Sequence, residues 1–226
     1  ILQLVDKTEK ELVEQDEQVE GKISIGCGES AAVQLLPKLI DSFRQKYSRV
    51  TFEIFTATAD LVKEQMDKGL LDIGLLIEPV DMEKYDFIRL NIREKWVVLM
   101  RTDDLLSGKE AVTAMDLSAL PLILPRRMNV QSELASWFGS YYEKLNVVFT
   151  SNLSTNSAIM VNGGLAYSLV IEGSLPFLDQ SQVTYRPLDP PLTATSVLAW
   201  KRGQPFSLAA TKFIGHIQCF LGIREQ

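Results

Sequence analysis

The chain contains 226 residues, of which 46% are hydrophobic and 23% are charged, and its formal net charge is −6. These proportions are typical of a globular chain with one large core or two modest ones, and they exclude bulk disorder and low-complexity classes. Binding to a phosphate backbone requires a basic surface, which an acidic chain lacks. We therefore expect any contact with nucleic acid to come from another segment.

The sequence shows no signal for a membrane or for export. No stretch approaches the ~18 uninterrupted apolar residues of a membrane span. The first 20 residues carry seven acids and two lysines, whereas an export signal begins basic and then becomes apolar. Cys27 and Cys219 form no CxxC pair, which favours a reducing compartment. The expectation is a cytoplasmic protein without membrane contact.

Residues 1–20 contain no glycine or proline, and Val5, Leu12 and Val19 recur every seven positions. This spacing predicts a helix with one narrow apolar stripe, ended by Gly21. Such a short acidic helix is only marginally stable alone. It is therefore either the end of a longer helix or a segment that frays.

The next part of the chain alternates between strand and helix patterns. We expect strands over 22–27, 50–56 and 71–77, with helices from Ala32 to Phe43 and over 61–68 between them. Ser30 is a candidate N-cap of the first helix, and Thr58 or Asp60 of the second. This order is typical of a doubly wound half-domain, which binds its ligands at the carboxyl ends of its strands.

A second block repeats this order after a turn expected over 79–86. Its expected strands are 96–100, 122–124, 147–150 and 165–171, and its expected helices are 114–120, 132–144 and 155–162. Prolines at 187, 190 and 191 indicate a break, followed by a strand over 196–200 and a helix over 207–221. The sequence therefore predicts two lobes, with crossings near 90–93 and 188–191 that would act as a hinge.

The turn from Gly26 to Ala31 resembles a dinucleotide fingerprint, in which glycines let a pyrophosphate approach a helix N-terminus. Ala31 replaces the last glycine, and Glu29 would repel the pyrophosphate. One alternative is a plain strand-to-helix turn. Another is a small-ligand site, in which backbone N–H groups and the Ser30 hydroxyl bind an oxyanion.

Arg126 and Arg127 follow another expected strand, at its carboxyl end. They could clamp a carboxylate in bidentate fashion or form a solvated surface pair. Asn156 and Ser157, near the start of the helix predicted over 155–162, could offer donors to a ligand or cap that helix.

The sequence contains few residues or motifs that indicate a catalytic site. His216 is the single histidine and lies on an apolar helix face, so we interpret it as a packing residue. No GxSxG, HExxH or Walker A sequence occurs. We therefore expect no enzymatic activity, no cofactor and no metal site.

Several motifs in order resemble one family over residues 21–222. The first part carries GKISIG at 21–26, LLP at 35–37 and GLLDIGL at 69–75. The second carries WVVLM at 96–100, IMVNGGL at 159–165 and AWKR at 199–202. Together they resemble the effector-binding domain of LysR-type transcriptional regulators.

The resemblance implies an α/β fold of the type-2 periplasmic-binding-protein kind, with two Rossmann-like lobes joined by two crossover strands. Subdomain I would comprise 21–90 plus 191–226 and subdomain II 91–190, while 1–20 would be the remnant of a linker helix. The family implies a homodimer through subdomain I, a tetramer of the full-length protein, and DNA contact only through an N-terminal winged helix-turn-helix that this chain lacks.

The resemblance also implies a small-molecule effector between the lobes. Ser30 matches a hydroxyl residue that contacts effector in the family, whereas Ile77 and Ile159 replace threonines and disfavour a small, highly polar effector. Glu29 and the arginine pair suggest an organic carboxylate with a donor group near Glu29. The predicted effector-binding residues are Gly28, Glu29, Ser30, Thr56, Thr58, Ile77, Arg126, Arg127, Asn156, Ser157 and Glu172.

The expected mechanism is a binding switch, in which the effector favours one interlobe angle or dimer arrangement. The competing interpretation is a transport-type solute-binding protein of the same fold, which would need an export signal and should be monomeric. A small enzyme with this fold is the third interpretation.

Overall fold

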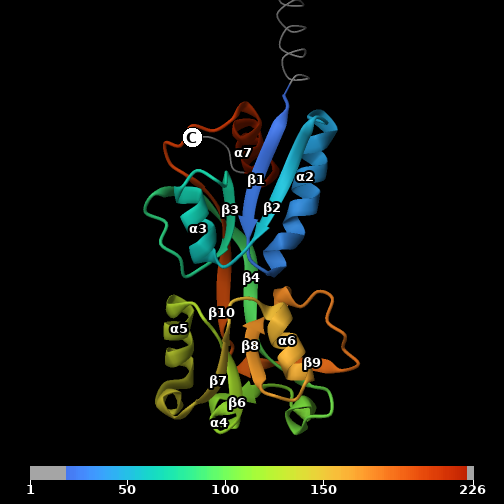
Figure 1. Cartoon of the computed structure of the whole chain (residues 1–226), viewed down its shortest axis with the longest axis vertical. Coiled ribbons are helices and arrows are strands. Elements are labelled where there is room, and N and C mark those ends of the chain that lie inside the picture. Colours follow the sequence, from blue (N-terminus) through green and yellow to red (C-terminus); the bar gives the residue numbers. More distant parts are fainter. Residues whose placement is uncertain (1–18, 223–226) are drawn as a thin grey trace, which may run out of the picture.

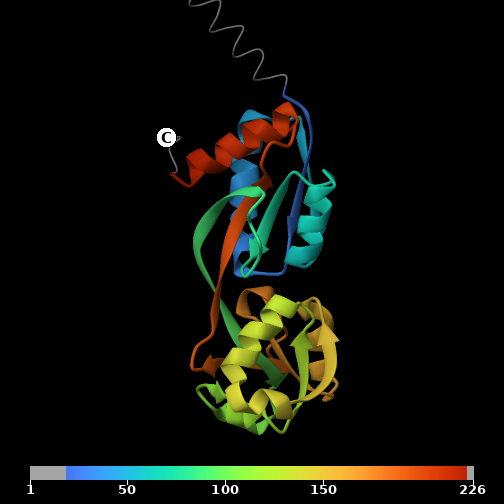
Figure 2. The same ribbon diagram turned by 90° about the vertical axis from the view of Figure 1, so that its left-hand side faces the viewer.

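The computed structural model describes residues 19–222, so the helix predicted over 1–20 lies outside the described residues apart from its last two positions. The chain forms two lobes stacked along the long axis of the molecule (Figure 1). The two strands β4 and β10 run between the lobes, and the view turned by 90° shows the same division (Figure 2).

Lobe I is built on three parallel strands in the order β2–β1–β3, followed by the antiparallel β10. Helices α2 and α7 pack on one face of this sheet and α3 on the other. The elements are β1 (Gly21–Cys27), η1 (Ala31–Gln34), α2 (Leu35–Lys46), β2 (Val50–Thr56), α3 (Ala59–Asp67), β3 (Ile73–Ile77), β10 (Thr193–Lys201) and α7 (Leu208–Phe220).

Lobe II repeats the arrangement, with parallel strands in the order β8–β6–β7. Its core also has two faces, one under α4 and α5 and the other under α6. The elements are η2 (Leu105–Gly108), β5 (Val112–Thr113), α4 (Ala114–Leu117), β6 (Pro121–Pro125), α5 (Met128–Phe138), η3 (Gly139–Lys144), β7 (Asn146–Ser151), α6 (Ser154–Asn162), β8 (Tyr167–Ile171), η4 (Glu172–Ser174) and β9 (Val183–Asp189).

Strand β4 (Tyr85–Arg101) joins the two sheets. Its residues 85–95 pair with β10 in lobe I, and its residues 96–99 pair with β8 in lobe II. One side chain of this strand, Glu94, is fully buried at the change of partner. The strand therefore belongs to both lobes and fixes where their facing edges lie.

Two glycines let α3 lie close to the sheet of lobe I. A Cβ atom at Gly26 would lie 2.4 Å from Cγ1 of Val62, and one at Gly74 would lie 2.7 Å from Sδ of Met66. A larger residue at either position would require the facing side chains of α3 to move. The first turn of α3 lies against lobe II.

The structure corrects several expected boundaries. Residues 85–101 form one long strand where the sequence indicated a turn reaching 86 and a separate strand over 96–100. Strand β9 was missed because Pro187, which lies inside it, indicated a break. The helix predicted over 132–144 begins at Met128 and ends at Phe138, because Gly139 adopts a positive φ of 55°. Within the described residues, no helix is long and apolar enough to span a membrane.

Candidate functional site

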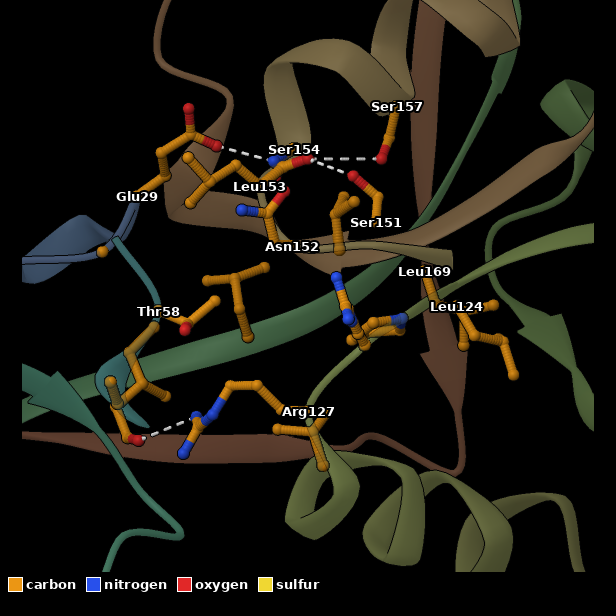
Figure 3. A pocket seen from close by; sticks show the side chains of 18 of the residues that line it. Glu29, Thr58, Leu124, Arg127, Ser151, Asn152, Leu153, Ser154, Ser157 and Leu169 are labelled. Atoms are coloured by element: carbon orange, nitrogen blue, oxygen red, sulfur yellow. Dashed lines mark hydrogen bonds between the residues drawn. The ribbon is translucent and has the colours of Figure 1, made fainter. Parts of the chain in front are cut away.

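A cavity of about 100 Å³ lies between the lobes, at the carboxyl ends of β1 and β3 on one side and of β6, β7 and β8 on the other. This is where doubly wound sheets bind ligands, because loops and helix N-termini converge there. Figure 3 shows residues of both lobes around it. The apolar part of its wall includes Leu75, Ile77, Trp96, Leu124, Leu169 and Ile171.

Glu29 bridges the lobes on one side of the cavity. It lies in the turn after β1, and its carboxylate accepts a hydrogen bond from the backbone N–H of Ser154 at 2.7 Å (Figure 3). It also accepts one from the hydroxyl of Thr155 at 2.6 Å. Those donors begin α6 of lobe II. A carboxylate is favoured at a helix N-terminus, where unpaired N–H groups carry partial positive charge.

Arg127 bridges the lobes on another side. Its guanidinium, at the start of α5, donates to both carboxylate oxygens of Asp60 at 3.0 and 3.3 Å, and Asp60 belongs to the first turn of α3. It also donates to the carbonyl oxygens of Ile77 and Pro79 at 3.3 and 2.9 Å. A bidentate pair of this kind fixes orientation as well as distance.

A third contact between the lobes involves backbone atoms. Gly173 of η4 lies so close to η1 that a Cβ atom placed on it would be 2.1 Å from the backbone nitrogen of Ala31. No side chain fits at that separation, so the present arrangement of the lobes requires glycine at this position.

The helix end after β1 is occupied by the chain itself. The two carboxylate oxygens of Glu94 accept the backbone N–H groups of Ala31 and Ala32 at 3.0 Å each, and one also accepts the hydroxyl of Ser196 at 3.0 Å. The N–H groups that the sequence offered to an oxyanion are therefore satisfied by Glu94. Ser30 occupies the predicted N-cap position, at the start of η1, but its side chain makes no capping hydrogen bond.

In the part of the chain that the structure describes, several polar side chains around the cavity have no such partner, among them Thr58, Asn152, Arg126 and Trp96. Among the residues that the structure describes, the exposed guanidinium of Arg126 forms no hydrogen bond or ion pair. Trp96 is only 5% exposed, and its indole Nε1–H has no acceptor. A buried donor without a partner costs free energy, so its presence next to a cavity calls for an explanation.

The structure brings seven of the eleven predicted effector-binding residues to the cavity: Gly28, Glu29, Thr58, Ile77, Arg126, Arg127 and Ser157. Their roles differ from those expected. The arginine pair is divided, because Arg127 is already paired with Asp60 and only Arg126 is free to pair with a ligand. Ser157 donates its hydroxyl to the carbonyl of Leu153, within its own helix.

The other four predicted residues, Ser30, Thr56, Asn156 and Glu172, do not line the cavity. Ser30 is buried, and Thr56 and Asn156 are exposed beyond the cavity wall. Glu172 accepts a hydrogen bond from the Tyr185 hydroxyl at 3.2 Å and pairs loosely with Lys95 at 3.8 Å. The order of residues along the chain indicated proximity to the strand ends, but not the direction of the side chains.

Sequence reasoning missed Glu94 and Trp96. Trp96 opens the WVVLM motif and was predicted only as a strand residue. Glu94 lies in the same strand, two positions before that apolar run, and a carboxylate this close to the run was the available signal that a buried acceptor lay there.

No catalytic group is evident in the described part of the chain. The Ser42 hydroxyl donates to the Leu39 carbonyl at 3.1 Å, so its 2.8 Å contact with His216 Nε2 does not activate it as a nucleophile. Cys27 is a free thiol whose pKa is raised by burial, which keeps it protonated. Within residues 19–222 no cluster of metal-ligating side chains occurs.

Comparison with known proteins identifies the family of this chain. The model of the LysR substrate binding domain matches residues 16–221. The chain belongs to this family. The LysR-type relatives include the uncharacterized HTH-type transcriptional regulator YvbU of Bacillus subtilis (strain 168), 30% identical over 195 residues, or 86% of this chain and 65% of YvbU.

A second relative is the Hca operon transcriptional activator HcaR of Escherichia coli (strain K12), 26% identical over 92% of this chain and 70% of HcaR. The chain thus spans about two thirds of the length of these regulators. Among solved structures, the CcmR regulatory domain of Synechocystis PCC6803 in complex with 2-PG is 19% identical, with a TM-score of 0.69 over 89% of this chain and 97% of that domain.

These findings confirm the predicted family and the two-lobed, type-2 periplasmic-binding-protein-like fold. The chain is a LysR effector-binding domain, and its relatives are transcriptional regulators.

Proposed function

We propose that this chain senses a small organic molecule bound in the cavity between its lobes, on behalf of a LysR-type transcriptional regulator. The observation that carries the proposal is the cavity itself, which is lined by both lobes and crossed by polar contacts between them. A molecule that binds there touches both lobes at once. Its affinity therefore depends on how the lobes are placed.

The proposed mechanism is a shift between two lobe arrangements. A ligand moves such an equilibrium only to the extent that it binds one arrangement more tightly than the other. The Glu29 and Arg127 bridges stabilise the arrangement described here, so a ligand that fits beside them reinforces it and one that displaces them favours another. The CcmR domain with 2-PG is an example of a relative that holds a small molecule.

The proposed subdomains follow the sequence expectation, with 21–90 and 191–226 as subdomain I and 91–190 as subdomain II. We infer dimerisation through subdomain I, where β2 is an edge strand that exposes Ile54 and Phe55. An apolar edge strand without a neighbour is suited to pairing with a second copy. DNA contact and assembly into a tetramer would require an N-terminal segment, and the whole regulator would act in the cytoplasm.

The test is native mass spectrometry of the freshly purified chain combined with a thermal-shift screen of small metabolites. The proposal predicts a dimer and at least one compound that is retained or that raises the melting temperature by several degrees. Competition between stabilising compounds would assign them to one site. A chain that carries no small molecule and is stabilised by no compound in a broad screen contradicts effector sensing, and a monomer at micromolar concentration contradicts the dimer.

A further inference from the structure

The charges around the cavity specify which ligand it can hold. The N-termini of η1, α3, α5 and α6 reach the facing edges of the lobes, and helix N-termini are the usual places for an anion. Two of these four are already neutralised, since Glu29 accepts from the first turn of α6 and Glu94 from the first turn of η1. A ligand anion would have to displace one of these carboxylates to reach either of those two helix ends.

The two cations of the cavity wall also differ in whether they are already paired. Two arginines line the cavity, and the bidentate pair with Asp60 occupies Arg127. Arg126 has no partner in the described part of the chain. It is therefore the single cation of this wall that is free to pair with a ligand. Its place directly after β6 puts it at the rim of the cavity.

Trp96 supplies a second, independent indication. Its ring is buried in the wall, and its Nε1–H donor lacks an acceptor. Buried indole N–H groups usually find a partner. An oxygen atom of a bound ligand would provide one once the wall opens, because solvent does not reach Nε1 in the present arrangement. The remaining wall is largely aliphatic, and its other polar side chains, among them Thr58, Asn152 and Ser168, carry no charge.

We propose that the effector is an organic acid with a single carboxylate, which pairs with Arg126, and a compact apolar body, with one ligand oxygen accepting from Trp96 Nε1. This inference rests on the proposed function. The present cavity, about 100 Å³, is smaller than the ~150 Å³ that encloses benzene, so a larger body requires the lobes to separate. A second carboxylate would find no second unpaired arginine among the lining residues, so we expect diacids to bind more weakly than monoacids.

The experiment is a titration of the whole chain, followed by tryptophan fluorescence and calorimetry, with two matched sets of probes. One set is hexanoate, its amide hexanamide and the diacid adipate. The other is benzoate, benzamide and terephthalate. The expected result is that at least one monoacid binds, while its amide and its diacid bind at least tenfold more weakly.

The variants locate the two contacts. Arg126→Gln should weaken monoacid binding at least tenfold, Arg126→Lys should retain part of it, and Trp96→Phe should weaken it severalfold. Arg44→Gln, which removes an exposed arginine from α2, is the matched control and should bind as the parent does. Melting temperatures of all variants report that they fold.

The outcomes separate this inference from the proposed function. Unchanged monoacid affinity in Arg126→Gln, or amides that bind as tightly as acids, overturns the inference. If neither monoacid binds but neutral or cationic compounds stabilise the chain in the metabolite screen, the inference is again wrong and effector sensing stands. If no compound of any charge binds, the proposed function fails first.

Discussion

Glu94 illustrates how a single buried carboxylate can hold a lobe edge in place. Its side chain is 0% exposed and accepts two backbone N–H groups and one hydroxyl. A carboxylate is tolerated at such depth because hydrogen bonds to charged acceptors are strong and because the N-terminus of η1 is positive. The residue thus ties β4, which belongs to both lobes, to the turn that carries Glu29.

Replacing Glu94 should destabilise the fold. Glu94→Ala leaves three buried donors without an acceptor, and we expect it to lower the free energy of unfolding by about 3–5 kcal/mol. Urea unfolding measures this quantity. Glu64→Ala, which breaks an exposed i,i+4 pair with Lys68, is the control and should cost less than about 1 kcal/mol. A similar cost for both variants would contradict the assigned role.

His216 should make stability depend on pH. Burial among Phe43, Phe213 and Phe220 lowers its pKa below the ordinary 6.5. The unfolded chain therefore takes up a proton more readily than the folded chain as the pH falls through 6.5, and stability is lost. Above that pH the effect vanishes, because histidine is neutral in both states.

We expect unfolding free energies measured between pH 7.5 and 5.5 to decline in the parent more than in His216→Gln. The chain has no other histidine, and carboxylates mostly titrate at lower pH, so the difference between the two curves isolates this side chain. Parallel curves would show that the imidazole titrates as it does in water.

At the scale of elements, periodicity predicted most strands and helices because each lobe alternates buried strands with amphipathic helices. It did not predict the length of β4, since most side chains of residues 85–95 are exposed and only residues 96–100 form a continuous buried run. The candidate site was predicted in part. Strand ends indicated Glu29 and Arg127, but their pairing across the lobes depends on three-dimensional distances that no local pattern carries.

The Glu29 bridge should protect the first turn of α6. Glu29→Ala removes the acceptor of the Ser154 N–H, and we expect amide hydrogen exchange in the peptide around residues 150–160 to accelerate severalfold. Exchange in α2 should stay unchanged. The control is Glu53→Ala, which removes an exposed carboxylate of β2 that pairs with Lys22 of β1. If the α6 peptide exchanged alike in both variants, Glu29 would have no bridging role.

A substitution at Gly173 should separate the lobes without changing any residue of the cavity wall. Gly173→Ala places a methyl group against the backbone of Ala31, which cannot move independently of its hydrogen bond to Glu94. We expect a larger radius of gyration in small-angle scattering and weaker binding of any ligand that contacts both lobes. Gly108→Ala, at a position with open space around the added atom, is the matched control. An unchanged radius would mean that the lobes absorb the methyl group locally.

At the scale of the whole molecule, two similar lobes joined by β4 and β10 can change their relative position at the crossing while each core stays intact. The family resemblance predicted this architecture, and the comparisons confirm it. Which contacts lie between the lobes could not be predicted. Glu94, Trp96 and Gly173 acquire their importance only when the lobes meet.

The central claim is that a small molecule in the cavity changes or fixes the relative position of the lobes. Double electron–electron resonance tests it most directly, with spin labels on Glu64→Cys in lobe I and Ser132→Cys in lobe II, in a Cys219→Ser background diluted with unlabelled chain. We predict that saturation with a ligand of the cavity shifts or narrows the distance distribution. A distribution unchanged by a ligand whose binding has been verified by titration would contradict the account.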